Sequence, residues 1–128
     1  MNSIKVVCGI IWKDGKILLA RRKLEKTLGG YWEFPGGKLE PNEDPILALQ
    51  RELQEEMGMT VSNVRYHASN IHEYDNFIIE LFAFECDFES ATFYLTDHDQ
   101  YVFVSPDEFS NYMVAPADEY FVLGLKAS

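Results

Sequence analysis

Two apolar runs at the start of the chain, residues 5–12 and 16–21, flank the tripeptide Lys13-Asp14-Gly15. Strand-forming residues on both sides of an Asp-Gly pair predict a β-hairpin. Residues 31–34 have the composition of a short strand that ends at Pro35, because proline cannot donate to a sheet ladder. The chain therefore begins with β-structure.

The apolar spacing changes to a helical period in residues 45–57. The apolar side chains that share one stripe of this helix are Ile46, Leu49, Leu53 and Met57. Asp44 is a plausible N-cap followed by proline at the first helical position, and Gly58 is a plausible C-terminal cap. The sequence therefore predicts a helix with one buried face.

Later apolar runs predict strands over residues 61–69, 71–74, 77–87 and 101–104. Ser105 and Glu108 have the spacing of a capping box, which predicts a short helix, and residues 118–126 have helix-compatible spacing. Strands before, between and after helices favour an α/β fold, with a mixed β-sheet and helices on its faces.

Composition and charge restrict the class of protein. The length of 128 residues predicts a single domain over residues 1–128, and 47% hydrophobic content indicates a folded core. A net charge of −10 disfavours a nucleic acid polymer as partner and favours cations. Cys8 and Cys86 lie in apolar runs, so we expect reduced core thiols. With no apolar segment near the ~20 residues of a membrane span, the expected location is cytoplasmic and away from membranes.

Three carboxylates, Glu52, Glu55 and Glu56, follow the i, i+3, i+4 spacing that puts them on one face of the predicted helix. An acidic run by itself is typical of a solvated helix face. Like charges this close disfavour a helix, however, and a cation between them would remove the repulsion. Oxygen ligands of this kind suit Mg²⁺ or Mn²⁺.

The acidic run belongs to a longer pattern with fixed offsets, at Gly37, Glu43, Arg51, Glu52, Leu53, Glu55, Glu56, Gly58 and Met59. This pattern resembles a complete Nudix box. The resemblance implies an α/β/α sandwich and a metal-dependent hydrolase that cuts a diphosphate linked to another moiety, most often a nucleoside. It also implies that the metal ligands are the Gly36 carbonyl, Glu52, Glu55 and Glu56, and that Glu43 and Arg51 stabilise the box.

Further positions resemble MutT-type Nudix enzymes, through VVCGIIWKDGKILLARR, YWEFPGGKLEP, SPDEF and APADEY. The resemblance implies an additional acidic ligand at Asp97, where the family usually has Glu, although Asp99 is an alternative and a solvated turn is another. It also implies a substrate-contacting Arg22, a stacking Phe34 and a base-reading Asp118. Phe34 could instead be core, and Asp118 could instead cap the last helix.

The basic cluster of Arg21, Arg22, Lys23 and Lys26, with Lys38, is expected to help bind phosphate, chiefly through Arg22 and Lys38, or else to form a solvated loop. His98, beside Asp97, is expected at the surface. The predicted function is Mg²⁺-dependent hydrolysis of a nucleoside triphosphate (8-oxo-dGTP, CTP or a related nucleotide) to monophosphate and pyrophosphate. Glu52 is the favoured base, with Glu55 and Asp97 as alternatives.

Other readings remain open: a Nudix hydrolase of nucleotide sugars, ADP-ribose or dinucleoside polyphosphates, or a nucleotide-binding module without catalysis. The intact box disfavours the binding module. The expected partner is a small nucleotide, and the protein is a monomer or a homodimer.

Overall fold

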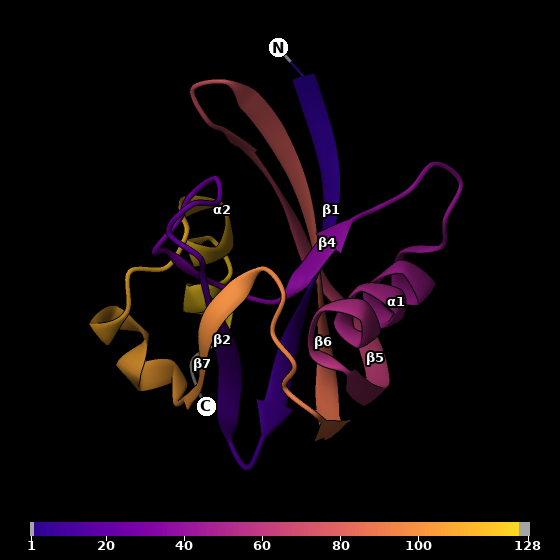
Figure 1. Ribbon diagram of the computed structural model, residues 1–128, viewed down its shortest axis with the longest axis vertical. Coiled ribbons are helices and arrows are strands. Elements are labelled where there is room, and N and C mark those ends of the chain that lie inside the picture. Colours follow the sequence, from indigo (N-terminus) through magenta and orange to yellow (C-terminus); the bar gives the residue numbers. More distant parts are fainter. Residues whose placement is uncertain (1, 126–128) are drawn as a thin grey trace.

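The computed structural model describes residues 2–125 (Figure 1). The strands are β1 (Asn2–Lys13), β2 (Lys16–Arg22), β3 (Trp32–Glu33), β4 (Gly36–Lys38), β5 (Met59–Glu73), β6 (Phe77–Ala91) and β7 (His98–Val104). The helices are α1 (Pro45–Met57) and α2 (Pro116–Glu119), and the 3-10 helices are η1 (Pro106–Asn111) and η2 (Val122–Leu125). No helix in the described part is long and apolar enough to cross a membrane.

The strands form a mixed sheet in the order β3-β2-β1-β6-β5. β1 and β6 run parallel, and the neighbouring pairs are antiparallel. The other edge of β1 is shared, because β4 pairs with its early residues Val6 to Cys8 and β2 with its last residues Trp12 and Lys13. β7 pairs with β2. The sheet therefore opens between β4 and β2, as Figure 1 shows.

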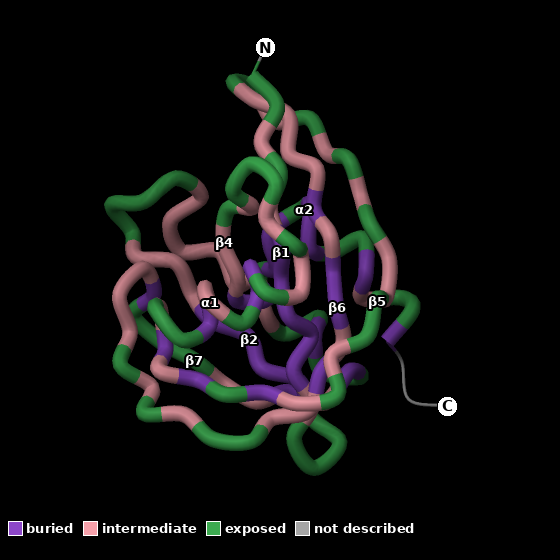
Figure 2. Tube along the Cα trace, turned by 90° about the vertical axis from the view of Figure 1, so that its right-hand side faces the viewer, coloured by how far each residue is buried: buried purple, intermediate pink, exposed green. Residues whose placement is uncertain are grey.

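Helices lie on both sides of this sheet (Figure 1). Alternate residues of β1 serve two cores: Val7 and Ile11 pack toward α1, whereas Cys8 and Ile10 pack toward η1, α2 and η2. Both cysteines are free and buried, as expected. Buried segments concentrate in the middle of the molecule, and the tips near the N-terminus are exposed (Figure 2). The predicted α/β/α sandwich with a mixed sheet is confirmed.

Helix α1 has the bounds that its caps predicted. The Asp44 side chain accepts hydrogen bonds from the backbone N–H groups of Ile46 and Leu47, both at 3.1 Å. Gly58 ends the helix in the left-handed conformation, with φ 56°, and its N–H donates to the Gln54 carbonyl. The predicted hairpin is also present, since Asp14 and Gly15 both have positive φ, at 52° and 78°.

Strand β4 was not predicted, because its sequence Gly36-Gly37-Lys38 has no strand propensity. Its glycines are needed for close packing. A Cβ at Gly36 would overlap the Val7 carbonyl oxygen, and one at Gly37 would overlap the Glu52 carboxylate. The glycine pair therefore lets β4 approach both β1 and the acidic face of α1.

Three predictions for the second half of the chain were wrong. Residues 61–69 and 71–74 belong to one strand, β5, whose register with β6 shifts at several positions. Ser105 makes no side-chain capping bond, and the segment after it is the 3-10 helix η1. The terminal helix is divided into α2 and η2. Its predicted last residue, Lys126, lies outside the described residues.

Candidate active site

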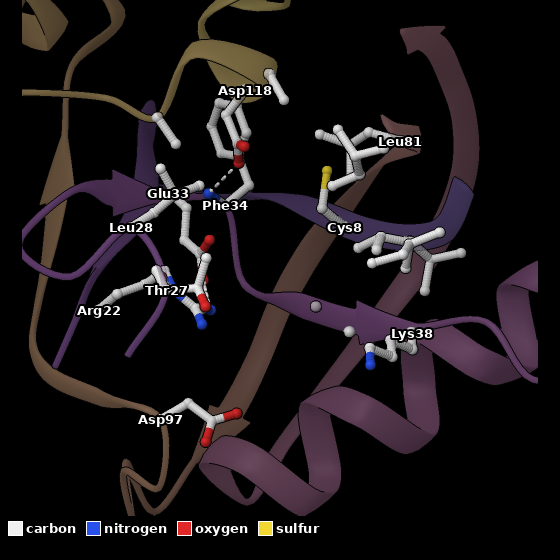
Figure 3. A pocket seen from close by; sticks show the side chains of 18 of the residues that line it. Cys8, Arg22, Thr27, Leu28, Glu33, Phe34, Lys38, Leu81, Asp97 and Asp118 are labelled. Atoms are coloured by element: carbon white, nitrogen blue, oxygen red, sulfur yellow. Dashed lines mark hydrogen bonds and ion pairs between the residues drawn. The ribbon is translucent and has the colours of Figure 1, made fainter. Parts of the chain in front are cut away.

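A cavity of about 610 Å³ lies where the sheet opens, between β4, α1, β6 and α2. This volume suits a nucleotide-sized ligand. The expected site residues that line the cavity are Arg22, Phe34, Gly36, Lys38, Glu52, Glu56, Asp97 and Asp118. Figure 3 shows that Asp118 and Asp97 lie at opposite ends, with Glu33 between them. The structure therefore gathers into one space residues that are up to 96 positions apart in the sequence.

Glu43, Arg51 and Glu55 lie beside the cavity and form an ion-pair cluster. Arg51 donates to both oxygens of Glu43, at 2.8 and 2.9 Å, to Glu52 Oε1 at 2.9 Å and to Glu55 Oε2 at 3.2 Å. The hydrogen bond to Glu43, followed by the contact with Glu52, raises the pKa of Arg51. The same hydrogen bond from Arg51 lowers the pKa of Glu43. Arg51 thereby joins the loop before α1 to the acidic face of the helix.

Glu52 is held against β4. Its Oε1 accepts from Arg51, and its Oε2 lies in the space that a side chain at Gly37 would fill. Burial raises the pKa of Glu52, and the hydrogen bond from Arg51 opposes that shift. Glu52 therefore presents a fixed carboxylate to the cavity.

Glu56 lies one turn after Glu52 on α1, and its carboxyl group is next to that of Asp97, in the segment before β7. Burial, followed by the neighbouring Asp97 carboxylate, raises the pKa of Glu56 to about 9. The pKa of Asp97 is lowered, first by Glu56 and then by Lys26, whose Nζ lies 3.4 Å from Asp97 Oδ1. Glu56 Oε2 is buried and has no hydrogen-bond partner among residues 2–125.

Glu55 points elsewhere. Its side chain is 60% exposed and pairs with Arg51, so the predicted three-carboxylate face is divided between the cavity and its rim. Among residues 2–125, no group of three or more His, Cys, Asp or Glu side chains is gathered closely enough to hold a metal. The residues nevertheless fit a divalent cation. Glu52, Glu56 and Asp97 all line the cavity, Glu56 Oε2 has no hydrogen-bond partner among the described residues, and a bound cation would favour the ionised carboxylates.

At the other end of the cavity, Asp118 Oδ2 accepts a hydrogen bond from the Phe34 backbone N–H at 2.9 Å (Figure 3). Burial, with the Glu33 carboxylate adding to it, raises the pKa of Asp118 well above its ordinary value. The alternative that Asp118 caps the last helix is wrong, since the N-cap of α2 is Ala115. Phe34 is both core and cavity wall, and its ring lies 6.1 Å from that of Phe109.

The basic residues of this region do not act as one cluster. Arg21 forms two hydrogen bonds to Asp99, at 2.8 and 3.0 Å, away from the cavity lining. Lys26 pairs with Asp97, and Arg22 pairs with Glu33. It is therefore Asp97, and not Asp99, that lies beside the acidic residues of α1.

The expectation of a surface His98 is wrong. The side chain is 1% exposed, and its Nε2 lies 2.9 Å from Glu33 Oε2. Sequence reasoning missed both residues of this pair. The polar neighbours of His98 are typical of a turn. Glu33 lies within the segment YWEFPGGKLEP, but the resemblance of that segment assigned Glu33 neither a role nor a partner.

Residues 6–123 match the family model described as the NUDIX domain. The chain belongs to the Nudix family. Its similarity to a CTP pyrophosphohydrolase of Escherichia coli is 43% identity over 118 residues, which cover 92% of this chain and 87% of the relative. An 8-oxo-dGTP diphosphatase of Proteus vulgaris is 42% identical over 84 residues, or 65% of this chain and 75% of that protein.

Among solved structures, a MutT protein from Methanosarcina mazei superposes on this Nudix hydrolase with a TM-score of 0.85 at 25% identity, covering 97% of this chain and 93% of the other. The predicted membership of the family, with its MutT-like character, is confirmed. Nudix hydrolases generally use a divalent metal. In this chain, the residues that suit a divalent metal are Glu52 and Glu56 of α1 and Asp97 before β7.

Proposed function

We propose that this Nudix hydrolase cleaves a nucleoside triphosphate, such as CTP, 8-oxo-dGTP or a related nucleotide, to the monophosphate and pyrophosphate with Mg²⁺. The observation that carries the proposal is the shared cavity. It has half-buried carboxylates at one end, suited to a metal and phosphates, and an apolar wall with a buried Asp118 at the other, suited to a base. The printed activities of the two relatives support the same substrate class.

Glu52, Glu55, Glu56 and Asp97, with the Gly36 carbonyl, would hold the metal, with Glu55 acting on the metal or its water from the rim of the cavity. When bound, Mg²⁺ would supply Lewis-acid polarisation of a phosphoryl oxygen and lower the pKa of an attacking water. Glu52 is the proposed general base. It lines the cavity, and Arg51 fixes one of its oxygens while Gly37 leaves room at the other.

Arg22 and Lys38 would bind phosphate oxygens, because both line the cavity and carry the charge opposite to the substrate. Phe34 would pack against the base. Asp118, fixed by the Phe34 backbone, would form the hydrogen bond that distinguishes one base from another. The free cysteines suit a reducing compartment, and we propose a cytoplasmic location.

A turnover screen tests the proposal. Purified protein is assayed with and without Mg²⁺ on canonical and oxidised nucleoside triphosphates, a nucleotide sugar, ADP-ribose and dinucleoside polyphosphates, with pyrophosphate and phosphate measured separately. We expect Mg²⁺-dependent release of pyrophosphate from one or more triphosphates. Preference for ADP-ribose or a dinucleoside polyphosphate would refute the proposed substrate class, and metal-independent binding without turnover would favour a binding module.

A further inference from the structure

His98 is buried at the start of β7, directly after the cavity residue Asp97. Its Nε2 lies 2.9 Å from Glu33 Oε2, whereas its Nδ1 is buried without a hydrogen-bond partner in the described structure. A buried imidazole with only one partner costs stability, because the other ring nitrogen has lost its water. The contact with Glu33 is therefore the feature that can explain why the His98 ring is buried here.

That contact belongs to a chain of hydrogen bonds that ends at Arg22. Glu33 Oε2 also accepts from Arg22 Nη1, at 3.2 Å, and Arg22 Nε donates to the Thr27 carbonyl at 2.7 Å. The guanidinium is therefore held at two of its nitrogens, by β3 on one side and by the loop after β2 on the other. Neither contact uses Nη2. Figure 3 shows Arg22 and Glu33 together in the cavity, between Asp118 and Asp97.

We propose that His98 and Glu33 are positioning residues that hold Arg22 in the orientation that receives a substrate phosphate. The proposal rests on the proposed function, in which Arg22 binds phosphate. His98 does not line the cavity, so it acts through Glu33 and not on the substrate.

Two physical effects explain the need for the pair. A free arginine side chain loses much rotamer entropy when it binds, and a guanidinium that is already fixed loses less. The Glu33 carboxylate would otherwise repel a nearby phosphate. Arg22 donates to its Oε2, and His98 donates to the same oxygen when Nε2 carries the ring proton. These bonds offset part of the charge and keep the carboxylate from competing for the substrate-facing N–H groups.

Steady-state kinetics on the preferred triphosphate test the proposal with three variants. His98→Phe removes the donor at similar size, and it should raise KM about 10-fold with kcat within about 2-fold, since Arg22 holds substrate and transition state alike. His98→Gln restores an N–H group near the Nε2 position and should return KM to near the wild-type value. His67→Phe is the matched control, because it breaks another His–Glu contact, His67 to Glu85 at 3.2 Å, outside the cavity.

The control should leave KM unchanged whatever its effect on melting temperature. A fall in kcat at constant KM for His98→Phe, or an equal KM change for His67→Phe, would assign His98 a structural role only and overturn the proposal. In the Arg22→Ala background, His98→Phe should have no further effect on KM. Effects that multiply independently would show that His98 does not act through Arg22.

A second readout is independent of turnover. The Arg22 Nη1–H signal in low-temperature ¹⁵N NMR reports the bond to Glu33. It should be protected from exchange in wild type, His98→Gln and His67→Phe, and lost in His98→Phe. An unchanged signal in His98→Phe refutes the relay. If wild type cleaves no triphosphate, the proposed function fails, and this signal still shows whether His98 acts on Arg22 through Glu33.

If His98→Phe does not fold, Glu33→Ala carries the same test. The same rise in KM and the same loss of signal are expected, and unchanged values would overturn the proposal.

Discussion

Glu56→Gln should stabilise the metal-free protein while removing its response to metal. Glu56 has a pKa of about 9 in the folded state, against an ordinary value of 4.5. Because the folded protein holds a proton that the unfolded chain releases, the free energy of unfolding falls as pH rises between these two values. Below about pH 4.5 the contribution is fully present, and above about pH 9 it is lost.

The magnitude follows from the interval between the two values. The free energy of unfolding should fall by about 1.4 kcal/mol per pH unit in that interval. At pH 7 the wild-type fold is therefore less stable than at pH 4.5 by at most about 3 kcal/mol, because Glu56 must keep its proton. Glutamine has the same shape and no proton to take up, and its amide can donate to Asp97. We expect the variant to be roughly 1 to 3 kcal/mol more stable at pH 7 in chelator, with a weaker pH dependence.

Urea unfolding of both proteins in chelator at pH 5, 7 and 8.5, and again in excess Mg²⁺, measures these quantities. Wild type should gain stability from Mg²⁺, and Glu56→Gln should gain much less. Glu108→Gln is the control, because it removes the same charge from an exposed side chain that does not line the cavity. Equal effects of the two substitutions, or a metal-free Glu56→Gln protein less stable than wild type at pH 8.5, would refute the reasoning.

Three further predictions concern function. Glu55→Gln should lower turnover by at least ~100-fold at an unchanged melting temperature, and near-normal turnover would place Glu55 outside the metal site. Calorimetry in chelator should show very weak triphosphate binding that Mg²⁺ restores, since carboxylates repel phosphate; tight binding without metal would contradict this. Asp118→Ala should change the preference among four triphosphates by roughly 5- to 150-fold, as measured by kcat/KM, whereas a uniform change across all four would exclude base reading.

Local features of the sequence determined those parts of the protein that depend on neighbours in the chain. The bounds of α1 followed from Asp44 and Gly58, because capping bonds join residues at most a few positions apart. The Asp14-Gly15 turn followed from the left-handed conformations that these residues tolerate. The spacing of the box was enough to indicate the family and its reaction class, since the same short helix carries most of its acidic groups.

Tertiary structure decided which acids face the cavity. Glu55 and Glu56 are adjacent and identical in sequence, yet Arg51 draws one to the rim while the segment before β7 covers the other. The burial of His98 depends on a contact with Glu33, 65 residues away. Strand β4 forms because glycine allows the backbone to approach β1, a contact that no local propensity encodes. Helical period fixes the direction of a side chain on its own helix, but its partner and its charge state depend on whatever the rest of the chain folds against it.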